Sequence, residues 1–309
     1  MMSVVCNRAQ LVFHGLTVGD RDSVQAVTLA AGRRNCNFTF ANLIGWQFWF
    51  NTEVCILDGV VVFRFNMEGA RAYMLCAAEP PTASLLELLA DDAAQLGADL
   101  RLMGLEDDHA ACVQEWCPQA VVEPQRNRYD YVYLRHELAT MQGKNLKAKR
   151  NHVNKFRLEH PEFEYVDLTP ARFGECRQLS MLWRNEVHHD SADYGEMVLA
   201  EQRAMERVLA QWDELGMRGG CIYAEGRLVA FTYGAAVTHD TFDVCVEKAD
   251  RTVDGAFNII NQQFAAHLPE QYVYVNREED MGLEGLRKSK LSYHPHQLLS
   301  YNIVTIPCR

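Results

Sequence analysis

The sequence lacks the features that mark secreted or membrane-spanning chains. Its ten cysteines include no Cys-x-x-Cys pair, and Arg8 is followed by only a short apolar run, unlike a signal peptide. The longest uncharged stretch, residues 35–52, is interrupted by asparagine and glutamine and is too polar to cross a bilayer. We therefore expect a cytoplasmic protein with reduced thiols and no transmembrane segment.

Recognisable metal-ligand spacings are also missing, since the chain has no Cys-x-x-Cys pair and no histidine pair at zinc-finger spacing. Its closest cysteines, Cys112 and Cys117, fall in a predicted helix and its exit. The adjacent His188, His189 and Asp190 are interpreted as a solvated turn, because neighbouring side chains at a helix end point apart. We expect no bound metal.

Positive charge is scarce, because 30 Lys+Arg oppose 41 Asp+Glu and give a formal net charge of −11. This balance argues against non-specific binding to nucleic acids or anionic membranes and leaves room only for a local basic site. By contrast, 48% of the residues are hydrophobic and 23% are charged, the composition of a packed globular protein. At roughly 150 residues per domain, a chain of 309 residues predicts two domains.

Apolar periodicity and turn signals predict a similar series of elements twice. The first series comprises strand 10–14, helices 22–31 and 39–49, strands 53–57, 60–65 and 71–77, helix 82–96, strand 100–105, helix 107–116, and strands near 121 and 131. The second comprises a long helix 137–159, strand 163–168, helices 170–187 and 195–215, strands 220–224, 228–236 and 241–247, helix 255–267, strand 272–276, helix 282–290 and strand 298–306. Asp58-Gly59 is typical of a type I′ hairpin turn.

This series resembles two tandem N-acyltransferase-like (GNAT-like) domains of the α+β class. Each domain would be a mixed, largely antiparallel sheet with helices on both faces. We place the first domain at residues 1–128, as a scaffold or acceptor wall, and the second at residues 129–309, as the candidate active half.

A basic helix in the second half contains the first candidate site. Lys149 falls on the apolar stripe formed by Leu146, Val153 and Phe156. A lysine that faces inward is costly unless an anionic group meets it. An anion or substrate site is one interpretation, and a solvated basic face with Lys149 reaching its edge is the other.

A second candidate cluster covers residues 276–293, which run from the end of a strand into a short helix. Loops in such positions commonly carry function. The acids at 278–280 suit a helix N-terminus without any further role. Nothing local requires the other polar residues, which are Asn276, Arg277, Arg287, Lys290 and Tyr293.

Several segments resemble the C-terminal catalytic domain of phosphatidylglycerol lysyltransferases and its stand-alone relatives. They are residues 129–133, Gly143-Lys144, residues 149–156 and 276–287, and, near the start of the first repeat, Asn37-Phe38 with Trp46. The resemblance implies two tandem acyltransferase-like folds related to the peptidoglycan-bridge aminoacyltransferases. It also implies that aminoacyl-tRNA is the donor, so that tRNA is a partner. The acceptor would be a hydroxyl or amine of a small molecule or lipid headgroup.

Acyl transfer needs a base for the acceptor and a donor for the developing oxyanion. We expect Glu278 or Asp280 to orient or deprotonate the acceptor. Arg287, Lys290 and Lys149 would neutralise phosphate or oxyanion charge. Substrate contacts are expected from Lys144, Lys149, Arg150, Asn151, Asn154, Asn276, Arg277 and Tyr293.

Two other classes of function stay open. The chain could be a coenzyme A-dependent N-acetyltransferase that uses acetyl-CoA on a small amine. Arg251, Gly255 and Ala256 would then form the phosphate loop, although Asp254 stands where such loops have their first glycine. The chain could also be a non-catalytic binding protein on the same fold.

Overall fold

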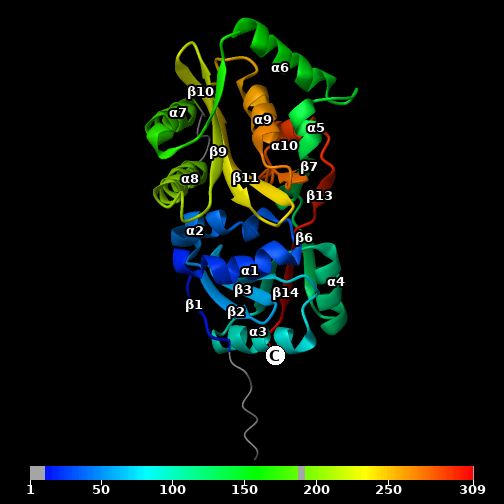
Figure 1. Cartoon of the computed structure of the whole chain (residues 1–309). Coiled ribbons are helices and arrows are strands. Elements are labelled where there is room, and N and C mark those ends of the chain that lie inside the picture. Colours follow the sequence, from blue (N-terminus) through cyan, green and yellow to red (C-terminus); the bar gives the residue numbers. More distant parts are fainter. Residues whose placement is uncertain (1–10, 187–191, 309) are drawn as a thin grey trace, which may run out of the picture.

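The computed structural model describes residues 11–186 and 192–308, which form two halves joined end to end (Figure 1). Each half is built on a seven-stranded sheet. The first half contains β1 (His14–Gly15), η1 (Val18–Asp20), α1 (Arg21–Ala31), η2 (Cys36–Phe38), α2 (Phe40–Phe50), β2 (Glu53–Leu57), β3 (Val60–Met67), β4 (Ala70–Cys76), α3 (Ala83–Gln95), β5 (Leu100–Leu105), α4 (Asp107–Trp116), β6 (Val121–Pro124) and η3 (Arg126–Arg128).

The remaining elements begin with the second half. They are β7 (Asp130–Leu134), α5 (Arg135–Thr140), α6 (Lys147–Glu159), β8 (Glu164–Asp167), η4 (Pro170–Arg172), α7 (Phe173–Glu186), α8 (Ala192–Ala210), β9 (Arg218–Ala224), β10 (Arg227–Ala236), β11 (Thr241–Ala249), α9 (Ala256–His267), β12 (Tyr274–Asn276), α10 (Glu284–Leu291), β13 (Gln297–Leu299) and β14 (Asn302–Ile306). His188, His189 and Asp190 lie outside the described residues.

Both sheets are mixed and largely antiparallel. The strand order is β1-β2-β3-β4-β5-β14-β6 in the first sheet and β13-β7-β12-β11-β10-β9-β8 in the second. Within them, β4 runs parallel to β5 and β11 runs parallel to β12. Helices cover both faces, with α1 and α2 opposite α3 and α4 in the first half, and α7 and α8 opposite α5, α6 and α9 in the second. The predicted α+β architecture is confirmed.

One hydrophobic core is continuous across the two halves, because α2 packs against α8 (Figure 1). Ile44 of α2 and Leu209 of α8 are both buried in it. At Gly45 a Cβ atom would lie only 3.1 Å from the Val208 side chain. A glycine at this position therefore permits the close approach of the two helices.

Most predicted elements are present with ends shifted by a few residues. Gly32 follows α1 with a φ of 70°, the left-handed conformation that glycine adopts easily at a helix end. The turn at Asp58-Gly59 is not type I′, because only Gly59 has a positive φ and type I′ requires it at both residues. The predicted strand 10–14 is also wrong in position, since β1 begins only at its last residue.

The prediction of one long helix over residues 137–159 is wrong, because the chain breaks between α5 and α6. Met141 and Gly143 adopt positive φ angles of 51° and 87° in the connecting loop. Arg150 donates hydrogen bonds to the carbonyl oxygens of Met141 and Gly143, at 2.7 Å and 3.2 Å. Apolar periodicity continues across the break because apolar residues on both sides of it are buried, in two core clusters, so the pattern alone could not reveal it.

The strand predicted over residues 298–306 is divided between the two sheets. β13 pairs with β7 in the second sheet, whereas β14 lies between β5 and β6 in the first (Figure 1). Asn302 fixes the crossing, since its amide donates to the Leu105 carbonyl at 3.0 Å and to Asp107 at 2.9 Å. The expectation that this strand would complete the second series is wrong for β14. Alternation of apolar and polar residues predicts a strand but does not show which strands pair with it.

In the described part of the chain, no helix combines the length and the apolar character that crossing a membrane requires.

Candidate functional site

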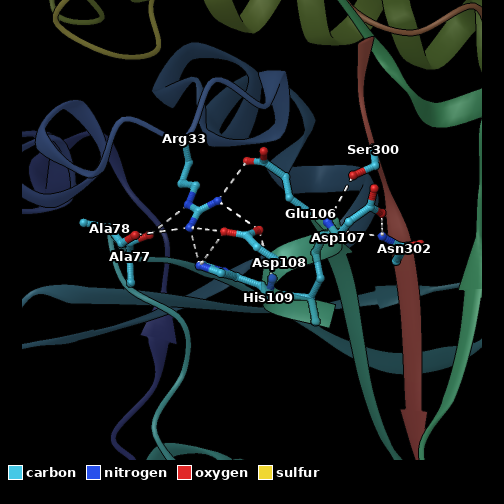
Figure 2. Close-up of polar contacts among 10 residues, drawn as sticks. Arg33, Ala77, Ala78, Glu106, Asp107, Asp108, His109, Ser300 and Asn302 are labelled. Carbon is cyan, nitrogen blue, oxygen red and sulfur yellow. Dashed lines mark hydrogen bonds and ion pairs between the residues drawn. The ribbon is translucent and has the colours of Figure 1, made fainter. Parts of the chain in front are cut away.

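A charged cluster in the first half lies where the chain leaves β4 and β5 (Figure 2). Arg33 donates to Asp108 at 2.9 Å and to two carbonyls after β4, and it contacts the ring of His109. Burial, reinforced by the Arg33 charge, lowers the pKa of His109 to about 4, so the neutral ring can accept a hydrogen bond from Arg33. These groups satisfy one another, and they anchor the segment that leads into η2.

The next residue, Arg34, is anchored to the second half instead. Its guanidinium donates to Asp240 at 2.8 Å and lies 4.1 Å from the centre of the Tyr274 ring. Its carbonyl accepts a hydrogen bond from the Asn276 amide at 2.7 Å. Because Arg33 and Arg34 hold opposite halves, η2 and the start of α2 are fixed at the boundary between the two sheets.

Four carboxylates gather at this boundary. This buried acid cluster consists of Asp130 of β7, Asp243 of β11, and Glu278 and Glu279 of the loop after β12. The backbone N–H of Cys36 and the side-chain amide of Asn276 both donate to Asp130, at 2.7 Å and 2.8 Å. Burial and the neighbouring Glu279 charge raise the pKa of Asp130 to about 6.

The hydrogen-bond donors to Asp243 and Glu278 come from α2 and the residue before it. Asn42 donates to Glu278 at 2.8 Å and to Asp243 at 3.1 Å. Thr39 stands at the N-cap of α2, yet its hydroxyl donates to Asp243 at 2.7 Å instead of capping the helix. Burial and nearby acids raise the pKa values of Glu278 and Asp243 well above their usual range.

The negative charge of the acid cluster is poorly balanced. Lys290 of α10 donates from its ammonium to the backbone carbonyls of Arg277, Glu278 and Glu279, and burial lowers the pKa of Lys290 although the two glutamates oppose this. Among the described residues, none of the cluster carboxylates forms an ion pair with lysine, arginine or histidine. The buried Oδ1 of Asp243 has no hydrogen-bond partner there either. A cationic group would therefore be favoured here.

Two sets of donor atoms in the cluster are close enough to share one cation. Cys36, Asp130 and Glu279 form one set, and Asp243, Cys245 and Glu278 form the other, with the donor atoms of each set within 4.8 Å of one another. A thiol with two carboxylates is not among the common zinc sites, which use imidazole or several thiolates. Protein N–H and O–H groups already donate to these acids. An ammonium group, which donates hydrogen bonds, fits this setting better than a metal ion.

Asp280 has its hydrogen-bonding capacity used within the protein. Arg287 binds both carboxylate oxygens at 2.8 Å and 2.9 Å, while Tyr131 and Arg126 donate to one of them at 2.6 Å and 3.0 Å. Burial alone would raise the pKa of Asp280, but the hydrogen bonds from Arg287 and Tyr131 hold it below its usual value. Asp280 and Arg287 therefore brace the loop that carries Glu278, and the geometry does not favour Asp280 as a base.

Cations also gather beside α9. Arg277 donates to Glu247 at 2.8 Å, and it shares the Tyr293 ring with Lys149, whose ammonium lies 4.3 Å from the ring centre. Burial and the Arg277 charge lower the pKa of Lys149. The Nη1 group of Arg277 is buried without a partner among the described residues. Two cations with one paired acid make this region suited to an anion.

The other residues predicted for the basic helix lie apart from these clusters. Lys144, Asn151 and Asn154 are exposed, and Arg150 holds the loop before α6. The structure thus brings together Lys149, Arg277 and Tyr293 but leaves Lys144, Asn151 and Asn154 facing solvent.

The predicted phosphate loop at the start of α9 is covered. A Cβ atom at Gly255 would lie 2.9 Å from the His152 carbonyl of α6, and Lys155 of α6 pairs with Asp254 at 2.6 Å. The backbone N–H of Ala256 donates within the chain, to Val253. Arg251 is exposed. Because α6 occupies the N-terminus of α9, these residues do not fit the pyrophosphate of coenzyme A.

Sequence reasoning missed part of the acid cluster. Asp130, Asp243 and Asn42 belong to no motif of the second half's loop, and α2 was predicted only as a helix. The one local signal was Asp243, a carboxylate placed between Phe242 and Val244 in an apolar strand. Such a residue is buried and needs partners from elsewhere in the fold.

The chain matches a known protein family and resembles solved structures. The family described as "Phosphatidylglycerol lysyltransferase, C-terminal" matches residues 30–304. The crystal structure of a conserved protein of unknown function from Bacteroides thetaiotaomicron is 38% identical, with a TM-score of 0.91 over 96% of this chain and 100% of that one. The C-terminal domain of a putative lysylphosphatidylglycerol synthetase from Agrobacterium fabrum is 10% identical, with a TM-score of 0.65 over 93% of this chain and 92% of that one.

Two further similarities are more distant. A tandem GNAT protein from the clavulanic acid biosynthesis pathway has a TM-score of 0.50 and 12% identity over 96% of this chain and 98% of that one, in agreement with the predicted GNAT-like fold. An uncharacterized protein of Mycoplasmoides gallisepticum is 21% identical over 58% of this chain. The chain spans 56% of the length of that curated relative.

Proposed function

The chain belongs to the phosphatidylglycerol lysyltransferase C-terminal family, and on this premise we propose that it transfers an aminoacyl group from aminoacyl-tRNA to an acceptor hydroxyl or amine. The observation that carries this proposal is the buried acid cluster between the two halves. It lies where η2 and α2 of the first half meet the second sheet, and it has no cationic side chain paired with it among the described residues.

The acid cluster suits the one group that distinguishes an aminoacyl donor from a simple acyl donor. An aminoacyl ester carries an α-ammonium group, whereas an acetyl group carries no charge. Asp243 offers a free buried oxygen, and Glu278 lies beside it through their shared donor Asn42. An ammonium bound here would stabilise the ionised form of Asp243, whose pKa is raised by burial and by the neighbouring acids.

The anionic part of the donor would use the cations beside α9. Lys149 and Arg277 face the same aromatic ring, and Arg277 retains an unpaired buried N–H group. Among the described residues Lys149 pairs with no acid and one N–H group of Arg277 has no partner, so both cations are suited to a phosphate of the tRNA end.

Glu278 is the residue we assign as general base. Its pKa is raised by burial and by Asp243 and Glu279, which suits a group that must accept a proton. It takes the proton of the acceptor while the acceptor atom attacks the ester carbonyl carbon. The bond from that carbon to the ribose oxygen then breaks, and the proton passes to the ribose oxygen. Lys290 and Asp280 position the loop.

Glu278 is held for this role by strained backbone. Its φ is 56°, and its N–H donates to the Asn276 side chain at 2.7 Å. A left-handed conformation at a non-glycine residue persists only where the surroundings enforce it, and such residues concentrate at functional sites.

Acetyl-CoA is a weaker candidate donor because α6 covers the start of α9, where its pyrophosphate would bind.

The direct test of the proposal incubates the purified chain with a panel of radiolabelled aminoacyl-tRNAs, with glycerol phosphate and simple amines as trial acceptors. We expect loss of label from tRNA and its appearance on an acceptor. Acetyl-CoA is assayed in parallel.

Two variants assign the chemistry. Glu278→Gln should slow transfer by about a hundredfold or more, the usual contribution of a general base. Glu270→Gln, at an exposed position, should leave the rate unchanged. The proposal is abandoned if no aminoacyl-tRNA binds or reacts, or if transfer occurs only with acetyl-CoA. Full activity of Glu278→Gln would remove Glu278 from the mechanism.

A further inference from the structure

The first half contains an apolar pocket that no step of the proposed transfer has used. Its cavity volume is about 80 Å³, and it is partly open to solvent. The side chains that form its apolar walls are Leu43, Trp46, Phe50, Phe65, Met74 and Tyr301. They come from α2, β3, β4 and the segment before β14, so the pocket is a feature of the first half's fold.

One end of this pocket touches the buried acid cluster. Asn42 lines the pocket, while its amide nitrogen donates to Glu278 and Asp243. Asn37 also lines it, and its amide nitrogen donates to Asn35. Among the described residues, neither Asn37 nor Asn42 receives a hydrogen bond at its amide oxygen. The polar end of the pocket thus offers acceptors, which suit an ammonium group.

The charged group that lines the pocket is a cation. Arg128 lines the pocket and is half-buried, 3.6 Å from Glu68. No aspartate or glutamate is among the described residues that line the pocket. A cationic side chain inserted there would leave water without gaining a carboxylate and would approach Arg128.

From these observations we infer that the pocket binds the side chain of the transferred aminoacyl group and selects an apolar one, of the size of leucine, methionine or phenylalanine. The α-ammonium would lie between the amide oxygens of Asn37 and Asn42 and the acid cluster, with the side chain against Trp46. This inference rests on the proposed transfer function. It assigns the first half a direct role in choosing the donor.

Amino-acid amides test the pocket without tRNA, because they retain the ammonium and the side chain but lack a carboxylate. Calorimetric titrations of the full chain would compare leucinamide and phenylalaninamide with alaninamide and lysinamide. Burying a large apolar side chain should make the first two bind at least about tenfold more tightly than the others.

Matched variants locate the binding. Trp46→Ala should weaken leucinamide at least about fivefold, whereas Trp49→Ala, on the same helix but 41% exposed and outside the pocket, should not. Arg128→Glu should raise the affinity for lysinamide, and this gain cannot result from misfolding. Melting temperatures of all variants are recorded alongside.

The outcomes separate this inference from the transfer function. Preferential binding of lysinamide or alaninamide, or equal effects of Trp46→Ala and Trp49→Ala, would overturn the pocket assignment even where aminoacyl-tRNA is consumed. Binding of apolar amides by a chain that ignores every aminoacyl-tRNA would keep the pocket as an apolar-amine site and reject the transfer function. Transfer restricted to leucyl-, methionyl- or phenylalanyl-tRNA would support both.

Discussion

The side-chain amide of Asn42 donates a hydrogen bond to the Glu278 carboxylate over 2.8 Å, although 236 residues separate them in the sequence. Asn42 belongs to a helix of the first half, and Glu278 to a loop of the second. The protonation of the assigned base is therefore set partly by the other half, because this hydrogen bond stabilises the ionised carboxylate and lowers the pKa of Glu278 against the effect of burial.

Asn42→Leu should consequently raise the pH at which transfer reaches half its maximum, because Glu278 loses a donor to its charged form. The rate at neutral pH should fall about tenfold or more. A pH–rate profile measures the shift. Gln47→Leu on the same helix does not touch the acids and serves as the control. An unshifted profile for Asn42→Leu would contradict the assignment of Glu278 as base.

Asp243→Asn should stabilise the free protein at alkaline pH while abolishing transfer. The folded-state pKa of Asp243 lies above its ordinary value of 3.8, so the folded chain retains a proton that the unfolded chain has lost, and stability falls as pH rises through that window. Removing the charge should raise the free energy of unfolding at pH 8 and raise it less at pH 4. Urea unfolding at both pH values tests this, and a less stable variant at pH 8 would refute it.

Lys290→Met should destabilise the chain by roughly 3 kcal/mol, because three buried carbonyls lose their donor. Lys288→Met, at an exposed position of the same helix, should change stability by less than about 0.5 kcal/mol. Chemical denaturation of both proteins gives the comparison. Equal losses would mean that the ammonium of Lys290 contributes little.

Asp280→Asn should cost about 3 kcal/mol near neutral pH, since two arginines lose their carboxylate. The pKa of Asp280 is depressed in the folded state, so its stabilisation is present above 3.8 and is lost as pH falls below that value. The difference between variant and parent should therefore shrink in acid. A difference that is the same at pH 7 and pH 3 would exclude a charge-dependent role.

His109 should make the protein sensitive to mild acid. Its pKa falls from 6.5 in the unfolded chain to about 4 in the folded one, so the unfolded chain binds a proton first and stability declines as pH drops from 6.5 towards 4. The loss should approach about 3 kcal/mol. Because Asp130 has the opposite slope in this range, the informative quantity is the difference between the parent and His109→Gln. If the difference in free energy of unfolding between the parent and His109→Gln does not change with pH, His109 does not cause the acid sensitivity.

Much of the fold was accessible from the sequence because helices and strands bury one face at a characteristic period. Periodicity identifies which residues turn inward but not what they meet. The break at Met141 and the placement of β14 were therefore missed, since each depends on a distant neighbour.

The candidate site likewise contains residues that the sequence singled out and residues that only the fold reveals. The loop from Asn276 to Lys290 stood out because its charges exceed what a short helix needs. Asn42 and Asp243 did not, since their significance arises only where α2 meets β11. The acid cluster is a property of the interface between the halves, and no single segment of sequence encodes it.

The position of β14 also dictates when the first half can be completed during synthesis. As the chain emerges from the ribosome, β1 to β6 appear early, yet β5 and β6 have no partner between them until residues 302–306 follow. Until then the growing chain exposes the unpaired edges of β5 and β6. The two hydrophobic clusters to which the first half contributes also lack Ile303 and Val304, one in each. Nascent chains should therefore depend on protection from aggregation until residues 302–306 have emerged, and a ribosome stalled before residue 302 should hold a first half that has not closed.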